Sequence, residues 1–190
     1  MAATSDAVGL LEALTIPETL DLRVGIDEWQ DTADLVVDRN VIIVGSGTMN
    51  IYAALLNHVF EPLHFAMTPD GRSTEPIIAG GLRNQTHFGL HADGSHDSGF
   101  IMLAKSIFNL DKSIVWIAGI TGMATQAALA SLKDLLTGYI AIDDRAIGYV
   151  VSPRTPRGLG PGISEYYRKW RISEYKIVHQ VDADGNELIT

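Results

Sequence analysis

The residues best suited to chemistry form a short loop of small polar residues between an apolar run and a helical pattern. The apolar run is Val41–Val44, the helical pattern begins at Ile51, and residues 45–50 lie between them. A strand, a tight loop and a helix in this order aim backbone N–H groups and the positive end of a helix dipole at an anion. We therefore expect a small anionic ligand or cofactor here, with candidate binding residues Gly45, Ser46, Gly47, Thr48 and Asn50.

This loop matches a dinucleotide-binding fingerprint only in part. Gly45 and Gly47 stand at the first two glycine positions, one for the tight turn and one that lets the backbone approach phosphate. Asn50 stands where a third glycine or alanine would allow close helix packing, and the next expected strand, Leu63–Met67, carries no acidic residue for a ribose. These departures disfavour a nicotinamide-dependent oxidoreductase. The alternative is a loop that binds no ligand, in which the glycines only avoid steric clashes and the hydroxyl of Ser46 or Thr48 caps the helix.

A second loop of the same design follows the apolar run Ser113 to Ala118 and precedes an alanine-rich helix that extends through Leu136. It lacks the lysine of a Walker loop, which disfavours nucleotide hydrolysis through a P-loop. If the strands ending at Val44 and Ala118 are neighbours, both loops flank one crevice, where ligands of open α/β sheets bind. The candidate binding residues of this loop are Gly119, Thr121, Gly122 and Thr125.

A third segment, residues 86–97, is rich in histidine and aspartate. Imidazoles and carboxylates are metal ligands or acid/base groups. The spacing of His87 and His91 suits a helix, whereas the surrounding glycines indicate strand and loop, and this conflict speaks against a metal site. Proton transfer or contact with a polar ligand remains open, as does an ordinary surface loop. The candidate catalytic residues are His91, Asp93, His96 and Asp97.

Composition excludes several classes of protein. With 14 Lys and Arg against 23 Asp and Glu, the formal charge is -9 and the chain lacks the basic excess of a general nucleic-acid binder. Without cysteine there is no disulfide framework, thiolate metal site or cysteine nucleophile. The first residues lack a basic leader and no apolar run reaches spanning length, so we expect a cytoplasmic protein without membrane contact.

Periodicity predicts a Rossmann-like α/β fold, a layered and mostly parallel sheet with a C-terminal hairpin. At 190 residues we expect a single domain: a lead-in helix, strand and helix over 1–39, a core over 40–137, and C-terminal strands and hairpin over 138–190. In the core, apolar runs alternate with helical patterns at the spacing of a layered sheet. The near-continuous run at Ser113 to Ala118 is typical of a strand covered on both faces, as in parallel sheets.

Three stretches carry a family resemblance: Val41 to Asn50, Asp97 to Ile101 with the Asn109 loop, and Val115 to Thr125. In these stretches the chain resembles a Rossmann-type family found in archaeal S-layer-like and prokaryotic regulator-like proteins. The resemblance covers about the central half of the chain. It implies a small α/β domain with a glycine-and-asparagine loop after its first core strand, and it transfers no catalytic residues.

Three functions remain open. The first is a regulatory or sensor domain that binds a small anionic, nucleotide-like ligand and controls assembly or a partner domain. The second is a hydrolase of a nucleotide or N-glycosidic bond. The third is a structural subunit that assembles head to tail, because acidic residues gather before Asn40 and basic residues near the C-terminus. The basic residues are Arg154, Arg157, Arg168, Lys169, Arg171 and Lys176.

Overall fold

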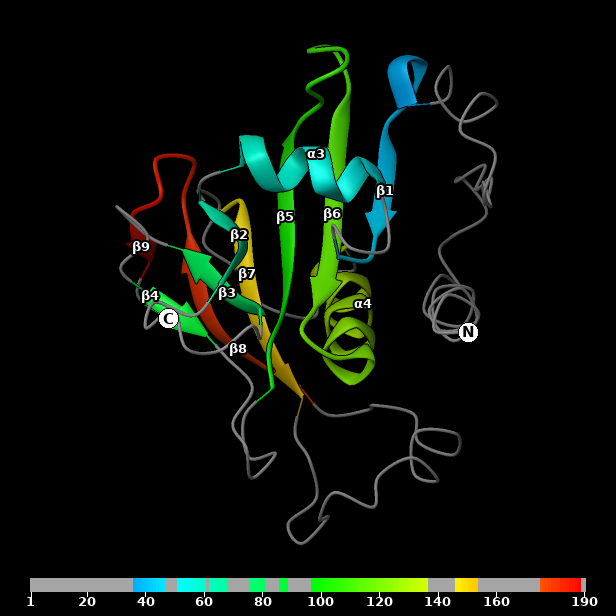
Figure 1. Cartoon of the computed structure of the whole chain (residues 1–190). Helices are drawn as coiled ribbons and strands as arrows, with labels where there is room; N and C mark the ends of the chain where they lie inside the picture. The colour runs from blue at the N-terminus through cyan, green and yellow to red at the C-terminus, as the bar shows by residue number, and fades with distance from the viewer. Residues whose placement is uncertain are drawn as a thin grey trace, which may run out of the picture.

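The computed structural model describes residues 36–46, 51–60, 62–67, 76–80, 86–88, 97–136, 146–153 and 175–188. These residues form a large sheet, a small sheet and two helices of full length (Figure 1). The lead-in elements expected before residue 36 lie outside the described residues. Neither of the two helices has the length and apolar character needed to cross a membrane.

The large sheet has six strands in the order β1-β6-β5-β7-β8-β9. Among the described strands only β1 and β6 pair in parallel, and every other neighbouring pair of this sheet is antiparallel. The core expected over 40–137 and the C-terminal strands contribute to one continuous sheet. The strands are β1 (Val41–Val44), β5 (Gly99–Lys105), β6 (Ser113–Gly119), β7 (Gly148–Pro153), β8 (Tyr175–Val181) and β9 (Glu187–Leu188).

The expectation of a mostly parallel, Rossmann-like sheet is therefore wrong. A parallel pair needs a crossover of a dozen or more residues, whereas β5 and β6 are joined by residues 106–112 alone. In this turn the Ser106 hydroxyl accepts hydrogen bonds from the Phe108 and Asn109 amides at 3.1 and 3.3 Å. The Ser106 amide donates to the Lys112 carbonyl at 2.9 Å. The turn reverses the chain and imposes an antiparallel hairpin.

One face of the large sheet is covered by α3 (Ile51–Val59) and by a small antiparallel sheet. The small sheet contains β2 (Leu63–Met67), β3 (Pro76–Gly80) and β4 (Thr86–Phe88) in that order. Asn57 joins the helix to this sheet, because its amide oxygen accepts from the Phe65 N–H at 2.7 Å and its amide nitrogen donates to the Phe65 carbonyl at 3.1 Å. Phe65 in turn packs edge-on against Phe100 and Trp116 of the large sheet.

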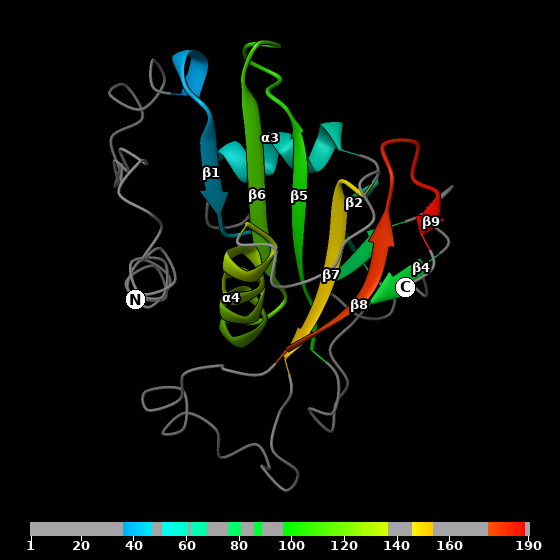
Figure 2. The same cartoon turned by 180° about the vertical axis from the view of Figure 1, so that it is seen from behind.

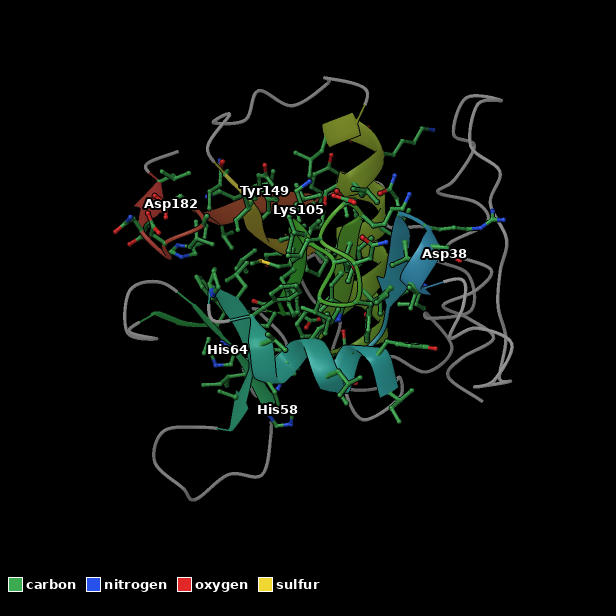
Figure 3. All side chains as sticks on the ribbon, turned by 90° about the horizontal axis from the view of Figure 1, so that it is seen from above. Asp38, His58, His64, Lys105, Tyr149 and Asp182 are labelled. Carbon is green, nitrogen blue, oxygen red and sulfur yellow. The ribbon has the colours of Figure 1, made fainter. Side chains whose placement is uncertain are left out.

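The opposite face is covered by α4 (Gly122–Leu136), as Figures 2 and 3 show. Ala128, Leu129 and Leu132 of this helix form a second core cluster with Ile101 and Ile117 of the sheet. The Tyr175 hydroxyl donates a hydrogen bond to the Asp134 carboxylate and ties β8 to the end of the helix. Burial, followed by the bond to Asp134, raises the pKa of Tyr175, so this phenol stays protonated as a donor.

The expected C-terminal hairpin is present as β8 and β9, with a turn that includes Gly185 at φ 78°. A β-bulge at Val178 interrupts β8, because Val150 pairs with His179 and Val151 with Ile177. The bulge changes which face of the sheet the following side chains occupy. Ile177 therefore packs on the α4 side, whereas Val181 packs on the α3 side.

Two glycines allow the first turn of α4 to lie directly on the large sheet. A Cβ at Gly119 would come within 2.8 Å of the Ala124 Cβ, and one at Gly99 within 2.9 Å of the Ala124 carbonyl carbon. Atoms at these distances overlap, so any side chain at either position displaces the helix. Gly122 differs, because a Cβ there meets nothing within 4 Å.

This contrast predicts opposite effects of the same substitution at two nearby glycines. Gly119→Ala should lower the free energy of unfolding by about 1–3 kcal/mol, because it overpacks the contact between helix and sheet. Gly122→Ala should leave it unchanged or raise it by up to about 1 kcal/mol, because alanine has fewer unfolded conformations to lose. Urea denaturation of both variants measures the difference. Equal stabilities would contradict the close approach of α4.

Candidate functional site

The two glycine loops begin at the same end of the large sheet, where the parallel strands β1 and β6 finish side by side. In the register of the parallel pair, Val44 is opposite Ile117, which confirms that the strands ending at Val44 and Ala118 are neighbours. Gly99 pairs with both Gly119 and Val151, so the start of β5 and the end of β7 reach this edge too. We call this end of the strands, with residues 44–46, 97–99, 119–122 and 151–152, the loop edge. The chain leaves β1 toward α3 on one face and leaves β6 toward α4 on the other.

Asp97 and Thr121 meet at the loop edge and form its polar centre. The Thr121 hydroxyl donates a hydrogen bond to Oδ2 of Asp97 and accepts one from the Ala124 amide at 3.3 Å, which makes Thr121 the N-cap of α4. The Ser98 amide donates to Oδ1 of Asp97 at 2.9 Å. The Ser152 hydroxyl of β7 donates to the Asp97 carbonyl oxygen at 2.9 Å. Asp97 thus connects β5, β7 and the start of α4.

The Asp97 carboxyl is a perturbed acid, with only 6% of the residue exposed. Burial raises the pKa of Asp97 above its ordinary value of 3.8, and the hydrogen bonds from Thr121 and Ser98 partly oppose this rise. A buried carboxyl with a raised pKa beside a helix N-terminus can hold or release a proton, or accept hydrogen bonds from a ligand. The sequence proposed Asp97 and Thr121 for different roles, and the fold places them in contact.

Comparisons with known proteins supply no template for this edge. No protein-family model, curated protein or solved structure matches the chain. The resemblance to a Rossmann-type family therefore stays a prediction from the sequence.

Several of the candidate binding residues at the loop edge use their polar groups within the fold. The Gly45 amide donates to the Ile117 carbonyl at 2.9 Å, and its carbonyl accepts from the Trp116 indole at 3.1 Å. Gly45 has φ 112°, a left-handed conformation that favours glycine. Thr125 is buried and its hydroxyl donates to the Thr121 carbonyl at 3.2 Å. Gly45 thus allows the chain to turn after β1, and Gly119 allows α4 to lie close to β6. Thr125 stabilises the first turn of α4.

The amides of Gly122 and Met123 remain as donors at this edge. The Ala124 amide is capped by the Thr121 hydroxyl and the Thr125 amide bonds to the Thr121 carbonyl at 3.1 Å. Within the described chain the two preceding amides have no acceptor, as is usual for the first turn of a helix. Gly122 is exposed and has open space where a side chain would be. An external acceptor can therefore reach the helix end here.

Other predicted site residues lie outside the described residues. They are Gly47, Thr48, Asn50, His91, Asp93 and His96, together with the acidic N-terminal residues other than Asp38 and all the basic C-terminal residues except Lys176. Ser46 is described and is half-buried next to Gly45. Within the described part of the chain, no three His, Asp or Glu side chains are grouped as a metal site would require.

The sequence missed two polar residues that the fold places near other polar groups, half-buried Ser152 and buried His179. Ser152 carries no motif, and only the pairing of β7 with β5 brings it to Asp97. His179 is buried, with Nδ1 at 2.7 Å from the Glu187 carboxylate and its ring 5.0 Å from that of Phe88. Its Nε2 is without a hydrogen-bond partner among the described residues. A histidine within an apolar alternation gives no sequence signal that separates it from a surface residue.

The raised pKa of Asp97 predicts how its contribution to stability changes with pH. The native state holds the Asp97 proton more tightly than the unfolded state does, so stability falls as pH rises from 3.8 to the native pKa. Asp97→Asn removes this loss and keeps both contacts, since its oxygen can accept from Ser98 and its amide can donate to Thr121. Urea denaturation across the acid range should show the variant gaining stability relative to the wild type as pH rises. A constant difference would contradict the raised pKa.

Proposed function

We propose that this chain is a regulatory or sensor domain that binds a small anionic, nucleotide-like ligand at the loop edge. The observation that carries the proposal is the parallel pair β1 and β6, from which the chain leaves to opposite faces. In open α/β sheets such a divergence opens a crevice beyond the carboxyl ends of the strands, and ligands bind in it. One parallel pair is enough to produce this local geometry.

The positive end of α4 supports an anionic ligand. The amides of Gly122 and Met123 point their donors out of the first turn, and a fifteen-residue helix places a partial positive charge there. The glycine at position 122 lets a phosphate or carboxylate approach the backbone without meeting a Cβ. A bound anion would complete the capping that Thr121 begins.

The Asp97 carboxyl favours a ligand that carries donors as well as a negative charge. Each of its oxygens already accepts one hydrogen bond, and a carboxylate has further acceptor positions for hydroxyl or amino groups. A nucleotide-like molecule carries hydroxyl and amino groups beside its phosphate. Differential affinity of such a ligand for two states of the domain would bias assembly or a partner domain.

A thermal-shift screen tests this proposal with AMP, ATP, ADP-ribose and inorganic phosphate as probes. A probe at 100 times its Kd should stabilise the native state by about 2.7 kcal/mol. Gly122→Glu should abolish the shift, because its carboxylate occupies the helix end and repels an anion. The same substitution should keep the protein folded, since an acidic residue in the first turn of a helix is favourable by about 0.3–1 kcal/mol.

Gly122→Gln is the matched control, because it has the size of the glutamate without its charge. It should retain at least part of the shift. No stabilisation of the wild type by any anionic probe would contradict the proposal. Equal shifts in the wild type and the Gly122→Glu variant would place the ligand elsewhere.

A second candidate function is hydrolysis of a nucleotide or N-glycosidic bond, and the burial of Asp97 is the observation that favours it. A carboxyl whose pKa is raised by burial suits general acid or base catalysis. Product analysis of nucleotides and nucleosides incubated with the protein tests this. Turnover should fall by about 100-fold or more in Asp97→Asn, the size typical of a lost acid or base. Binding without turnover in the wild type would leave the sensor function and exclude hydrolysis of those probes.

A further inference from the structure

The Asp97 carboxyl lies beside the amides that the proposed ligand would use. Its Oδ2 accepts a hydrogen bond from the Thr121 hydroxyl, and Gly122 follows Thr121 in the chain. The Gly122 and Met123 amides have no acceptor within the described chain. A single residue therefore separates an anion on the Gly122 amide from a buried acid. An anion bound here has N–H donors and a carboxyl as neighbours.

No charge among the described residues compensates this acid. Three elements contact Asp97 through hydroxyl or amide groups, with Ser98 from β5, Thr121 from α4 and Ser152 from β7. The neighbouring residues along the sheet and the helix are uncharged as well, and no Asp, Glu, Lys, Arg or His occurs in the described ranges 98–104, 113–131 and 146–153. Two negative groups close together in a poorly solvated place repel each other strongly. An ionised Asp97 thus opposes any anion that carries no proton.

We propose that the loop edge binds its anion together with one proton, which is shared between an oxygen of the ligand and the Asp97 carboxyl. This inference rests on the proposed function, because it concerns the same site, and it narrows the class of ligand. A phosphate that keeps a proton on one oxygen can donate it to the ionised carboxylate, which is an acceptor only. A strong, charge-assisted hydrogen bond then replaces the repulsion. Asp97 is the residue that determines specificity among anions.

Sulfate is the anion that separates the possible sources of the proton. Phosphate and sulfate have the same tetrahedral shape, and at pH 8 both are mainly doubly charged, but only phosphate still carries a proton. Sulfate can bind only when Asp97 itself supplies the proton. Burial raises the pKa of Asp97, so its protonated form persists to a higher pH than that of an ordinary aspartate. Sulfate should therefore bind more tightly as the pH falls.

The same requirement divides nucleotide-like ligands into two groups. A terminal phosphate monoester has an ionisable proton with a pKa of about 6, whereas a phosphodiester has none. A nucleotide with a terminal phosphate can therefore bring the proton with it. A nucleotide whose phosphates are all diesters depends on the protonated form of Asp97. The ligand class that the loop edge favours is thus a phosphate or a phosphate monoester.

NMR titration of ¹⁵N-labelled protein with sodium phosphate and sodium sulfate tests the inference, with sodium chloride holding the ionic strength constant. The Ala124 and Thr125 amides report binding, because both are hydrogen-bonded in the first turn of α4 and exchange slowly. At pH 8 phosphate should bind about 10- to 100-fold more tightly than sulfate, the range of a hydrogen bond to a charged group. From pH 8 to pH 5 the sulfate Kd should fall, by at most about tenfold per pH unit, because one proton is taken up.

Asp97→Asn should remove the discrimination between the two anions. Its side-chain amide has two N–H donors, one for Thr121 and one for the ligand, so sulfate and phosphate should bind with similar Kd values. The sulfate Kd of this variant should not change with pH. His96→Gln is the matched control, because His96 precedes Asp97 in the sequence and histidine titrates near neutral pH. It should keep the wild-type profile.

The wild type alone can overturn the inference, so the test does not depend on the folding of a variant. Equal binding of phosphate and sulfate at pH 8, with no effect of pH on sulfate, would exclude the shared proton and leave the proposed function intact. A pH dependence that His96→Gln removes and Asp97→Asn keeps would also overturn the role of Asp97. No response to either anion from pH 5 to pH 8 would contradict the proposed function, and this inference with it.

Discussion

The contact between the first turn of α4 and the glycines of β5 and β6 determines the arrangement of the loop edge. With no side chain at Gly99 or Gly119, the Ala124 and Thr125 backbone lies against the strands. This proximity brings the N-cap hydroxyl of Thr121 to the Asp97 carboxyl, which stands one residue before the Ser98 amide that it also binds. Any larger residue on the strands would lift the helix and separate the two groups. The contact between Asp97 and Thr121 therefore depends on glycine at one position in each of two neighbouring strands, Gly99 in β5 and Gly119 in β6.

The same contact exposes the Asp97 carboxyl to two opposing effects on its pKa, the helix dipole and burial. A carboxyl placed near the positive end of a helix would ordinarily be favoured in its charged form. Burial acts against this, and its effect on the pKa of Asp97 is larger than that of the hydrogen bonds from Thr121 and Ser98. The helix keeps two amides that Thr121 does not cap, while the acid beside them is held partly away from solvent. Two uncapped amides and an acid with a raised pKa thus lie together at the loop edge, and the proposed ligand is argued from them.

Local elements could be predicted from the sequence, but strand direction could not. The runs Val41–Val44 and Leu63–Met67 are strands with the expected bounds, and the neighbouring positions of β1 and β6 were anticipated from their matching loops. The apolar run in β6 suggested a parallel sheet, yet it reflects burial beneath α3 on one face and α4 on the other. An antiparallel strand covered on both faces has the same composition. The pairing of Asp97 with Thr121, 24 residues apart, needed the whole sheet register and left no local pattern.

The amide of Asn57 has a consequence for how the small sheet ends. β2 is an edge strand of that sheet, and an unpaired edge offers N–H and C=O groups to any passing strand. By bonding both backbone groups of Phe65, one side chain from α3 acts as a surrogate strand residue. These two hydrogen bonds occupy the outer backbone groups of Phe65, so no strand of another chain can pair with them. A single side-chain amide thus protects this strand edge, and the five residues of β2 include no lysine or proline that could do the same.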